Sequence, residues 1–393
     1  MVRTSGMNHD SARYIILTGV YDDHYLETRN DKPALCTSAG KRLMLYRAIA
    51  DAAGISPLLL SPQPRGRGKT IPLPAVESQF GEFKQLFSRA SGIRKVRYFV
   101  DMVRYVGHVY RYTRNGDILI FDNYELIYVL AIYACRILGR SNGVILEYED
   151  GKHAIDRGYP KLISGLAEKI GRRLVRGAIL ATPSLGDRLP RHVPKIVIPG
   201  ILRPDIVFNP PPTRDKPILF IYSGSLDVER GIPLLLDYLE SSLIVENTVY
   251  HITGQGNYKN RFLRLMERYP GKIYFHGCVS EEELDRIRRL CHYGLNLQSS
   301  SNPISGVTYP SKTFDYLNAG IRVISTKAAG VPEVFEGNAI YLESEIISGL
   351  ADAIIRAKVA AAFVEPKVND TFMNTYTLKG TIIRLESLLQ QIN

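Results

Sequence analysis

Residues 309–326 combine side chains and backbone groups that could together hold an anion. Pro310-Ser311 predicts the start of a short helix, and Gly320 its end. Unsatisfied backbone N–H groups at a helix start attract anions. Lys312 and Asp315 are three residues apart and share one helix face. We therefore expect a nucleoside diphosphate here, with Lys312 at its phosphates and Asp315 at its ribose hydroxyls.

The second half of the chain alternates short apolar runs with helical patterns. Strands are predicted at residues 218–222, 249–253, 273–276, 294–297, 321–325 and 339–342, and helices near 233–240, 261–269, 281–291, 312–319 and 332–335. This alternation predicts a parallel, doubly wound α/β sheet, which binds ligands at the carboxyl ends of its strands. Gly224, Gly254 and Gly256 stand at such ends, where they could admit a phosphate or simply form tight turns.

The first half repeats this arrangement less clearly. Strands are predicted at residues 14–18, 117–121, 144–148, 179–182 and 195–198, and helices at 41–53, 96–112, 124–138 and 161–175. Gly19 follows the first strand, at a turn that could face a bound ligand or could simply be a tight turn. Residues 61–69 are rich in Pro and Gly, which indicates a mobile loop.

Six prolines between residues 199 and 217 indicate a linker. We therefore predict a first Rossmann-like domain at residues 1–200 and a second at 201–375. A helix at residues 376–393 would return to the first domain. Two such domains joined by a linker would face each other across a cleft.

Composition excludes several classes of protein. The chain has 393 residues, 45% of them hydrophobic and 23% charged, which suits two globular domains. No apolar run is long enough to span a membrane, and the N-terminus lacks the pattern of a secretory signal. The four cysteines are scattered, so we expect a reduced cytoplasmic protein without a zinc site.

The formal net charge of +11 favours an anionic partner. One segment is especially basic, with Asp101 as its only acid among Lys84, Arg89, Arg94, Lys95, Arg97, Arg104, Arg111 and Arg114. It could be a helix at an anionic membrane surface or an ordinary solvated face. It contains no recognised nucleic-acid-binding motif, so we expect no nucleic acid partner.

Four segments, residues 222–231, 251–256, 275–284 and 309–326, together resemble the GT-B glycosyltransferases of the large retaining class called family 4, or glycosyl transferases group 1. The resemblance implies two Rossmann-like domains and a nucleotide-diphosphate sugar held mainly by the second. It also implies transfer with retention, with no metal or other cofactor required. Over the first half only the pattern of strands and helices is similar.

The resemblance also implies which residues form the site. Of the family's basic pair, the first position here is Ser225 and the second Arg230; of its two acids, the earlier is Val307 and the later Asp315. Catalytic roles fall on Glu149, Arg230 and Lys312. The expected donor-binding residues are Gly224, Ser225, Gly254, Gly256, Val279, Thr308, Tyr309, Ser311, Thr313 and Asp315. The acceptor-side residues are Gly19, Asp150 and His153.

The reaction would build negative charge on the leaving diphosphate. Arg230, Lys312 and the amides of residues 311–313 could stabilise that charge without a metal. Structural explanations stand beside these roles. Arg230 could be a plain surface residue, Lys312 and Asp315 an exposed ion pair, and one of Glu149, Asp150 and His153 a helix cap.

We therefore expect a sugar to pass from a UDP- or GDP-sugar to a glycan or lipid-linked acceptor, in envelope or surface polysaccharide synthesis. The protein would be cytoplasmic, with peripheral contact at the inner membrane face left open. Two alternatives remain. One is a non-catalytic sugar-nucleotide-binding subunit that supports a partner transferase, and the other a nucleotide-sugar 2-epimerase.

Overall fold

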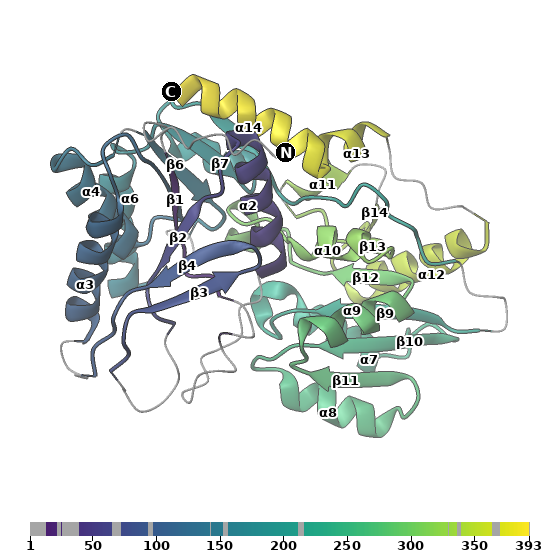
Figure 1. The fold of residues 1–393 in the computed structure, drawn as a ribbon. Coiled ribbons are helices and arrows are strands. Elements are labelled where there is room, and N and C mark those ends of the chain that lie inside the picture. Colours follow the sequence, from purple (N-terminus) through teal and green to yellow (C-terminus); the bar gives the residue numbers. More distant parts are fainter. Residues whose placement is uncertain are drawn as a thin grey trace, which may run out of the picture. The chain divides into compact units, whose positions relative to one another are not determined.

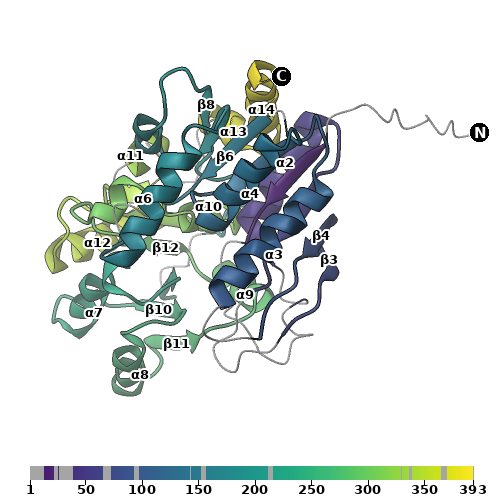
Figure 2. The same cartoon turned by 90° about the vertical axis from the view of Figure 1, so that its left-hand side faces the viewer.

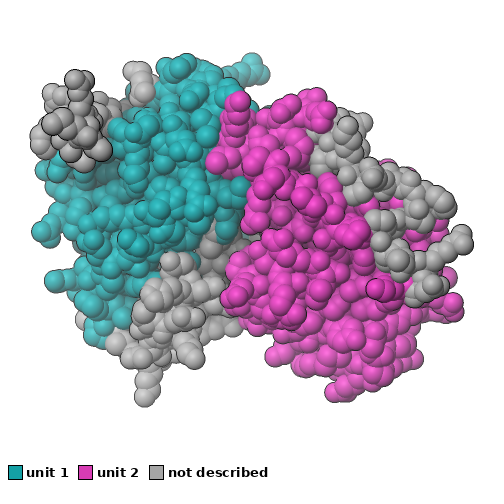
Figure 3. Space-filling view, turned by 45° about the vertical axis from the view of Figure 1, so that its right-hand side comes forward, with its two compact units in different colours: residues 1–198, 382–393 teal, residues 199–381 magenta. Residues whose placement is uncertain are grey.

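The chain folds into two compact units, one of residues 1–198 and 382–393 and the other of residues 199–381 (Figure 3). The chain passes from one unit to the other after Ile198 and again after Thr381. The computed structural model describes residues 13–21, 25, 39–64, 72–92, 97–141, 143–151, 156–210, 216–328, 330–335, 339–363 and 370–392. His153 and part of the predicted loop at residues 61–69 lie outside these ranges.

Unit 1 is built on an eight-stranded sheet in the order β3-β4-β2-β1-β5-β6-β7-β8. The strands are β1 (Tyr14–Leu17), β2 (Leu58–Ser61), β3 (Val76–Phe80), β4 (Phe83–Phe87), β5 (Ile118–Asp122), β6 (Gly143–Tyr148), β7 (Gly177–Leu180) and β8 (Lys195–Val197). All neighbours are parallel except β3 and β4. The doubly wound parallel sheet predicted for this half is confirmed.

The β3–β4 hairpin and strand β2 were not predicted. Phe80 pairs with Phe83 across a two-residue turn, in which Gly81 has a φ of 57°. A hairpin turn of this kind needs a positive φ, which glycine adopts without strain. Only alternate residues of β3 are sheltered, so the strand contains no continuous apolar run that would reveal it.

Helices cover both faces of the unit 1 sheet. They are α2 (Ala39–Ala53), α3 (Arg97–Tyr112), α4 (Leu126–Ile137), α6 (Tyr159–Gly171) and the C-terminal α14 (Leu378–Ile392). Helices α3, α4 and α6 lie side by side over one face and α2 lies over the other (Figures 1 and 2). At the end of α14, Ile392 packs against Gly143 and Gly177, the first residues of β6 and β7.

Unit 2 holds a six-stranded, fully parallel sheet in the order β11-β10-β9-β12-β13-β14. Each strand agrees with its predicted range to within one residue at either end: β9 (Ile218–Ser223), β10 (Thr248–Thr253), β11 (Ile273–Gly277), β12 (Tyr293–Asn296), β13 (Arg322–Ser325) and β14 (Ala339–Tyr341). Two parallel-sheet α/β units thus confirm the predicted fold class.

The helices of unit 2 are α7 (Ile232–Glu240), α8 (Lys259–Arg268), α9 (Glu281–Leu290), α10 (Lys312–Asn318), α11 (Val331–Phe335), α12 (Ile347–Phe363) and α13 (Asp370–Tyr376). Helices α12 and α13 were not predicted. Yet Leu350, Ile354 and Ala357 of α12 recur at helical spacing and are buried in the core of the unit. Their spacing was a usable signal.

A ladder of aromatic rings runs through the centre of this core. Tyr250, Phe220 and Tyr293 stack across three neighbouring strands, with ring centroids 5.3 and 5.7 Å apart. The two tyrosine hydroxyls also have partners, because Tyr250 meets the hydroxyl of Tyr238 at 2.9 Å and Tyr293 donates to the carbonyl of Ala357. Stacking therefore holds the middle strands together without leaving either hydroxyl unpaired. No helix in the described part of the chain is long and apolar enough to cross a bilayer.

Two glycines allow backbone strain and steric clash to be separated. Gly320 ends α10 with a φ of 75°, and a Cβ there would lie 2.1 Å from the Val207 carbonyl oxygen. Gly271 has nearly the same φ of 77°, but nothing lies within 4 Å of its Cβ position. We expect Gly271→Ala to lower the free energy of unfolding by about 1 kcal/mol, for the left-handed backbone alone. Gly320→Ala should lower it by about 3 kcal/mol, because overpacking adds to that strain. Urea unfolding of both variants measures the difference, and equal losses would refute the clash.

Candidate active site

The predicted anion-binding helix, α10, is short, and part of its N-terminus is already satisfied. Both the amide and the hydroxyl of Thr313 donate to the Pro310 carbonyl, at 3.1 and 2.8 Å. The Thr313 amide was expected to bind a phosphate, but this hydrogen bond already occupies it. A helix of seven residues also has a small dipole. Side chains must therefore supply most of the positive potential at this site.

Lys312, the first residue of α10, supplies one cation. Its Nζ lies 4.3 Å from the centroid of the Tyr222 ring, donates to the Tyr222 hydroxyl at 3.3 Å, and would be 3.5 Å from a Cβ at Gly224. Burial lowers the pKa of Lys312 to about 7, and repulsion from Arg230 acts in the same direction, whereas Asp315 partly opposes them. An anion bound here would restore the charge of this ammonium.

Arg230 supplies the second cation, at the end of the short helix η2 (Val228–Arg230). Its Nη1 donates to the Oε1 of buried Gln298 at 2.5 Å, and the Nε2 of Gln298 donates to Thr308 Oγ1 at 3.4 Å. Among the described residues, neither Arg230 nor Lys312 forms an ion pair with a carboxylate. Two cations that lack a counter-charge suit a doubly charged diphosphate.

Tyr222 and Gln298 were missed by the sequence reasoning. Tyr222 stands inside an apolar strand, where an aromatic residue indicates only core packing. Gln298 follows β12 by two residues and is completely buried. Its place just past the carboxyl end of a parallel strand was the available signal.

The glycines after the first two strands of unit 2 are explained by close packing of their loops. Gly254 has a φ of 130°, and a Cβ there would lie 1.8 Å from the carbonyl oxygen of Gly224. A Cβ on Gly256, with a φ of 155°, would lie 2.6 Å from the backbone of Leu226. Leu226 in turn donates its amide to the Gln255 carbonyl at 2.8 Å. These glycines let the two loops touch, which also places Gly224 beside Lys312.

Ser225 occupies the family's first basic position and carries a different set of contacts. Its hydroxyl donates to the carboxylate of Asp227, and its carbonyl accepts from the Tyr222 hydroxyl at 2.7 Å. Asp227 also accepts from the Asn257 amide at 3.0 Å. Ser225 therefore brings a neutral hydroxyl, bound to a carboxylate, to the position where the resemblance implies a cation.

Asp315 lies one turn after Lys312 and is partly exposed. Its carboxylate is 4.0 Å from Nη2 of Arg288, a buried residue of α9 that also pairs with Glu281 and Asp285, at 2.9 and 3.1 Å. The ion-pair partner expected for Asp315 in the structural alternative was Lys312, whereas the structure places Arg288 beside it. Arg288 fixes one side of this carboxylate. Val279, predicted at the donor, is partly buried in the loop between β11 and α9.

Two further predicted residues, Thr308 and Tyr309, are buried between β12 and α10, together with Ser305. Thr308 Oγ1 donates to the Ile304 carbonyl at 3.1 Å, and Ser305 Oγ donates to the Ser299 carbonyl at 2.6 Å. The ring of Tyr309 packs on Phe314 at 5.9 Å, within an aromatic cluster completed by Phe335, Phe372 and Tyr376. The structure therefore brings Thr308 to Gln298, whereas the Tyr309 side chain anchors α10 in the core.

Unit 1 gathers charged side chains at the carboxyl ends of β1, β5 and β6. Glu149 pairs with Lys41 Nζ at 2.6 Å and lies 3.8 Å from Arg42, which pairs with Asp122 at 2.5 Å. Burial would raise the pKa of Glu149, but Lys41 and Arg42 outweigh it and lower that pKa. Glu149 is thus a held, ionised carboxylate.

Glu147 is the unexpected member of this cluster. Burial raises its pKa to about 8, although Arg42 opposes the shift. Neither carboxyl oxygen has a hydrogen-bond partner in the described part of the chain. Lys41 and Arg42 form ion pairs with Glu149 and Asp122, and neither of them forms one with Glu147 in the part of the chain that the structure describes. Burial, with the carboxylates of Glu149 and Asp122 nearby, therefore raises the pKa enough to keep this carboxyl group protonated near neutral pH.

Asn123 fixes the backbone that carries the predicted acceptor-side residues. Its Oδ1 accepts from the amides of both Glu149 and Asp150 at 2.9 Å, and its own φ is 53°. Gly19 lies beside Tyr128, whose hydroxyl would be 3.2 Å from a Cβ at that position. Asp150 and Gly19 therefore belong to the same strand-end region as Glu149, and His153 lies outside the described residues.

The predicted basic segment lies on β4 and α3. Lys84 pairs with Glu77 of the neighbouring strand at 2.8 Å, and Arg97 lies 3.6 Å from Asp101, one turn along α3. Arg104 and Arg111 are exposed, and Arg94 and Lys95 lie outside the described residues. No three His, Cys, Asp or Glu side chains of the described residues gather as a metal site would require.

Comparison with known proteins agrees with this architecture. Residues 205–358 match the family described as glycosyl transferases group 1. The apo form of WaaB, a lipopolysaccharide outer core galactosyltransferase, superposes with a TM-score of 0.65 at 14% identity, over 96% of this chain and 99% of that chain. Sucrose-phosphate synthase from Thermosynechococcus elongatus gives 0.63 at 13% identity, over 96% and 94%.

A third structure with this fold contains a nucleotide sugar. Anabaena Alr3699/HepE, in complex with UDP-glucose, gives a TM-score of 0.61 at 13% identity, over 97% of this chain and 98% of that chain. The similarity in fold thus extends over both units, while the family match falls within unit 2. This chain has the GT-B fold, and the residues that match the glycosyl transferases group 1 family, 205–358, lie within its second unit.

Proposed function

We propose that this protein transfers a sugar from a UDP- or GDP-sugar to a hydroxyl of a glycan or lipid-linked glycan acceptor, with retention at the anomeric carbon. The product would enter envelope or surface polysaccharide synthesis, at the cytoplasmic side of the membrane. One observation carries the proposal. Two cations without a carboxylate partner, Lys312 and Arg230, lie at the carboxyl ends of the unit 2 strands, beside Gly224 and Gln298.

Similar structures support a nucleotide donor. Anabaena Alr3699/HepE is described in complex with UDP and with UDP-glucose, and a trehalose-6-phosphate protein from E. coli with UDP-2-fluoro glucose. In our proposal the diphosphate lies against Lys312 and Arg230. Asp315, oriented by Arg288, accepts hydrogen bonds from the ribose hydroxyls.

The proposed chemistry breaks the bond between the anomeric carbon and a phosphate oxygen. Negative charge grows on the diphosphate as this bond lengthens, so cations already in place stabilise the transition state more than the ground state. The face of the Tyr222 ring contacts the Lys312 ammonium, and Gln298 Oε1 accepts a hydrogen bond from the Arg230 guanidinium. Neither cation must then reorganise during the reaction. No metal is needed in this proposal.

Glu149 would stabilise the positive charge that develops on the sugar as the bond breaks. Its ion pair with Lys41 keeps it ionised and makes it a weak base, which favours electrostatic stabilisation of an oxocarbenium-like centre over removal of a proton. Asp150 also donates its amide to Asn123 Oδ1, and its carboxylate is proposed to lie on the acceptor side.

A second candidate function is a non-catalytic subunit that binds a sugar nucleotide and supports a partner transferase. Two departures from the family pattern favour it: Ser225 is neutral and bound to Asp227, and Val307 replaces an acid. Binding without turnover would distinguish this subunit from a transferase.

The first prediction concerns the nucleotide. In a thermal-shift screen of UDP, GDP, dTDP, CMP and ADP, we expect UDP or GDP to raise the Tm. A ligand at about 100 times its Kd stabilises the folded state by about 2.7 kcal/mol. Asp315→Ala should abolish the shift, because the ribose loses its acceptor. Asp285→Ala, which removes another carboxylate from Arg288, should keep it. No shift with any nucleotide would contradict the donor site.

The second prediction concerns the cations. Lys312→Ala and Arg230→Ala should each lower kcat by about a hundredfold, because each removes a group that stabilises the leaving diphosphate. The exposed Arg264 of α8 gives a matched control, and Arg264→Ala should keep wild-type kcat. Steady-state transfer assays, with circular dichroism to show that the variants fold, measure the effect. Wild-type rates in both site variants would show that the site is misplaced.

The third prediction follows from the pKa of Lys312, which is lowered to about 7 in the free protein. A bound diphosphate favours the protonated ammonium, so affinity should be constant below pH 7 and fall up to tenfold per pH unit above it. Lys312→Arg keeps its charge throughout this range and should flatten the profile. Isothermal titration calorimetry with the nucleotide sugar between pH 6 and 9 tests this. An equal slope in both proteins would mean that another group titrates.

A further inference from the structure

We propose that helix α6 and the residues after it form a docking surface for an anionic lipid membrane. The inference goes beyond the proposed sugar transfer, because its residues lie in unit 1 and none belongs to the donor site. It also differs from the basic segment on β4 and α3. Three observations carry it: a basic cavity, an apolar stripe beside that cavity, and further exposed apolar side chains on the neighbouring helices.

The cavity has a volume of about 710 Å³ and lies between α6 and the loops that flank β7 and η1 (Pro183–Arg188). It is lined by one carboxylate, Glu168, and by six cationic side chains, Lys161, Lys169, Arg172, Arg173, Arg176 and Arg188. Glu168 is already neutralised, because Arg188 binds both of its oxygens at 2.9 and 3.0 Å. The other five cations are therefore left to attract an anion.

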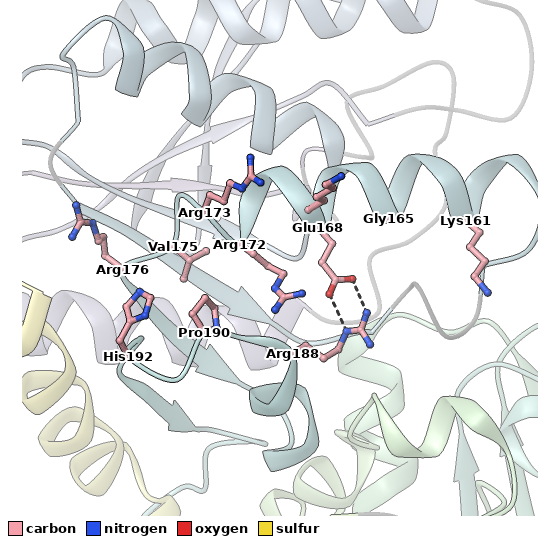
Figure 4. A pocket seen from close by; sticks show the side chains of 11 residues that line it. Lys161, Gly165, Glu168, Arg172, Arg173, Val175, Arg176, Arg188, Pro190 and His192 are labelled. Carbon is pink, nitrogen blue, oxygen red and sulfur yellow. Dashed lines mark hydrogen bonds and ion pairs between the residues drawn. The ribbon is translucent and has the colours of Figure 1, made fainter.

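Figure 4 shows how these side chains approach the cavity. Arg172 reaches down from α6 toward Arg188, with Arg176 and His192 at one end and Lys161 at the other. The cations are thus spread along the cavity rather than focused on one point. Such a spread suits several phosphate headgroups side by side better than a single small anion.

An apolar stripe runs along α6 next to the cavity. Tyr159, Leu162 and Leu166 are 73%, 72% and 51% exposed, and their spacing of three and four residues places them on one helix face. Lys161 and Gly165, which line the cavity, each precede a stripe leucine by one residue. A helix with exposed leucines on one stripe and cations on the next matches the pattern of interfacial membrane helices.

Further exposed apolar side chains lie on the same layer of helices. Nine of the eighteen large apolar side chains exposed among the described residues lie on α3, α4 or α6 or directly after α4: Tyr98, Phe99, Val103, Tyr133, Ile137, Leu138, Tyr159, Leu162 and Leu166. These helices lie side by side over one face of the unit 1 sheet (Figure 2). An exposed apolar area of this kind marks an interaction surface.

Charge complementarity selects the occupant. A soluble phosphate compound would explain the cations but would leave the leucines in water. A neutral apolar partner would cover the leucines and leave the cations unpaired. An anionic bilayer satisfies both, because its headgroups meet the arginines while the leucines enter the interface. Helix α8 provides the contrast: Lys259, Arg264 and Arg268 are exposed there, but no large apolar side chain is.

The chain contains no tryptophan, so a single introduced one reports on its own position. We expect Leu166→Trp to show a blue-shifted emission with vesicles of phosphatidylglycerol and phosphatidylcholine, and quenching by brominated lipid in them. Ile355→Trp, at an exposed position of α12, is the matched reporter and should show neither. No shift at Leu166→Trp, or equal shifts at both positions, would overturn the proposal.

Vesicle co-sedimentation separates the charges from the apolar stripe. Replacing Lys169, Arg172 and Arg173 by Gln should weaken binding to anionic vesicles about a hundredfold, and Leu162→Ser with Leu166→Ser about tenfold. Replacing Lys259, Arg264 and Arg268 by Gln removes the same charge from α8 and should change little. Equal losses in the two charge variants would show that only net charge matters.

The same variants distinguish this inference from the proposed function. The α6 variants should keep the thermal shift with nucleotide, which also shows that they are folded. Asp315→Ala should keep vesicle binding while losing that shift. If the α6 charge variant instead lost a thermal shift with inorganic pyrophosphate and bound vesicles normally, the cavity would be a site for a soluble phosphate compound and the membrane proposal would fail.

Discussion

The arrangement of unit 2 depends on keeping one ammonium group, that of Lys312, partly buried without a carboxylate partner. Burial and the nearby Arg230 both disfavour its charge, and Tyr222 offsets part of this cost by presenting its ring face and its hydroxyl. The short helix α10 can hold Lys312 there because Tyr309 and Phe314 anchor the helix in an aromatic cluster. The stability of the core thereby supports an unfavourable electrostatic arrangement that a bound anion would relieve.

In unit 1, by contrast, the buried cations form ion pairs with carboxylates. Lys41 and Arg42 reach Glu149 and Asp122, so these four groups nearly cancel, and Glu147 adjusts by keeping its proton. Both clusters stand at the carboxyl ends of parallel strands, where strand ends and neighbouring helices supply the side chains. One cluster therefore holds excess positive charge, and the other holds an ionised carboxylate beside a neutral one.

Agreement between expectation and structure was best where local pattern and tertiary role coincide. The four inner strands of unit 2 are mostly buried and read as apolar runs, and the ranges predicted for all six strands were correct to within one residue. The edge strand β3 exposes alternate residues and was missed. Gly254 and Gly256 were recognised by position, but their need for glycine comes from the contact between two loops that are far apart in sequence.

The sequence by itself determined the α/β class, the repeat of strand and helix, and the placement of Arg230, Lys312 and Asp315 near strand ends, because these follow from local periodicity and spacing. Only the tertiary structure decided which side chains meet. Gln298 reaches Arg230 across 68 residues and Lys312 reaches Tyr222 across 90. It also decided that Glu147 is left without a counter-charge. Charge balance and desolvation depend on neighbours that come from several strands. The spacing of residues along the chain does not reveal these neighbours.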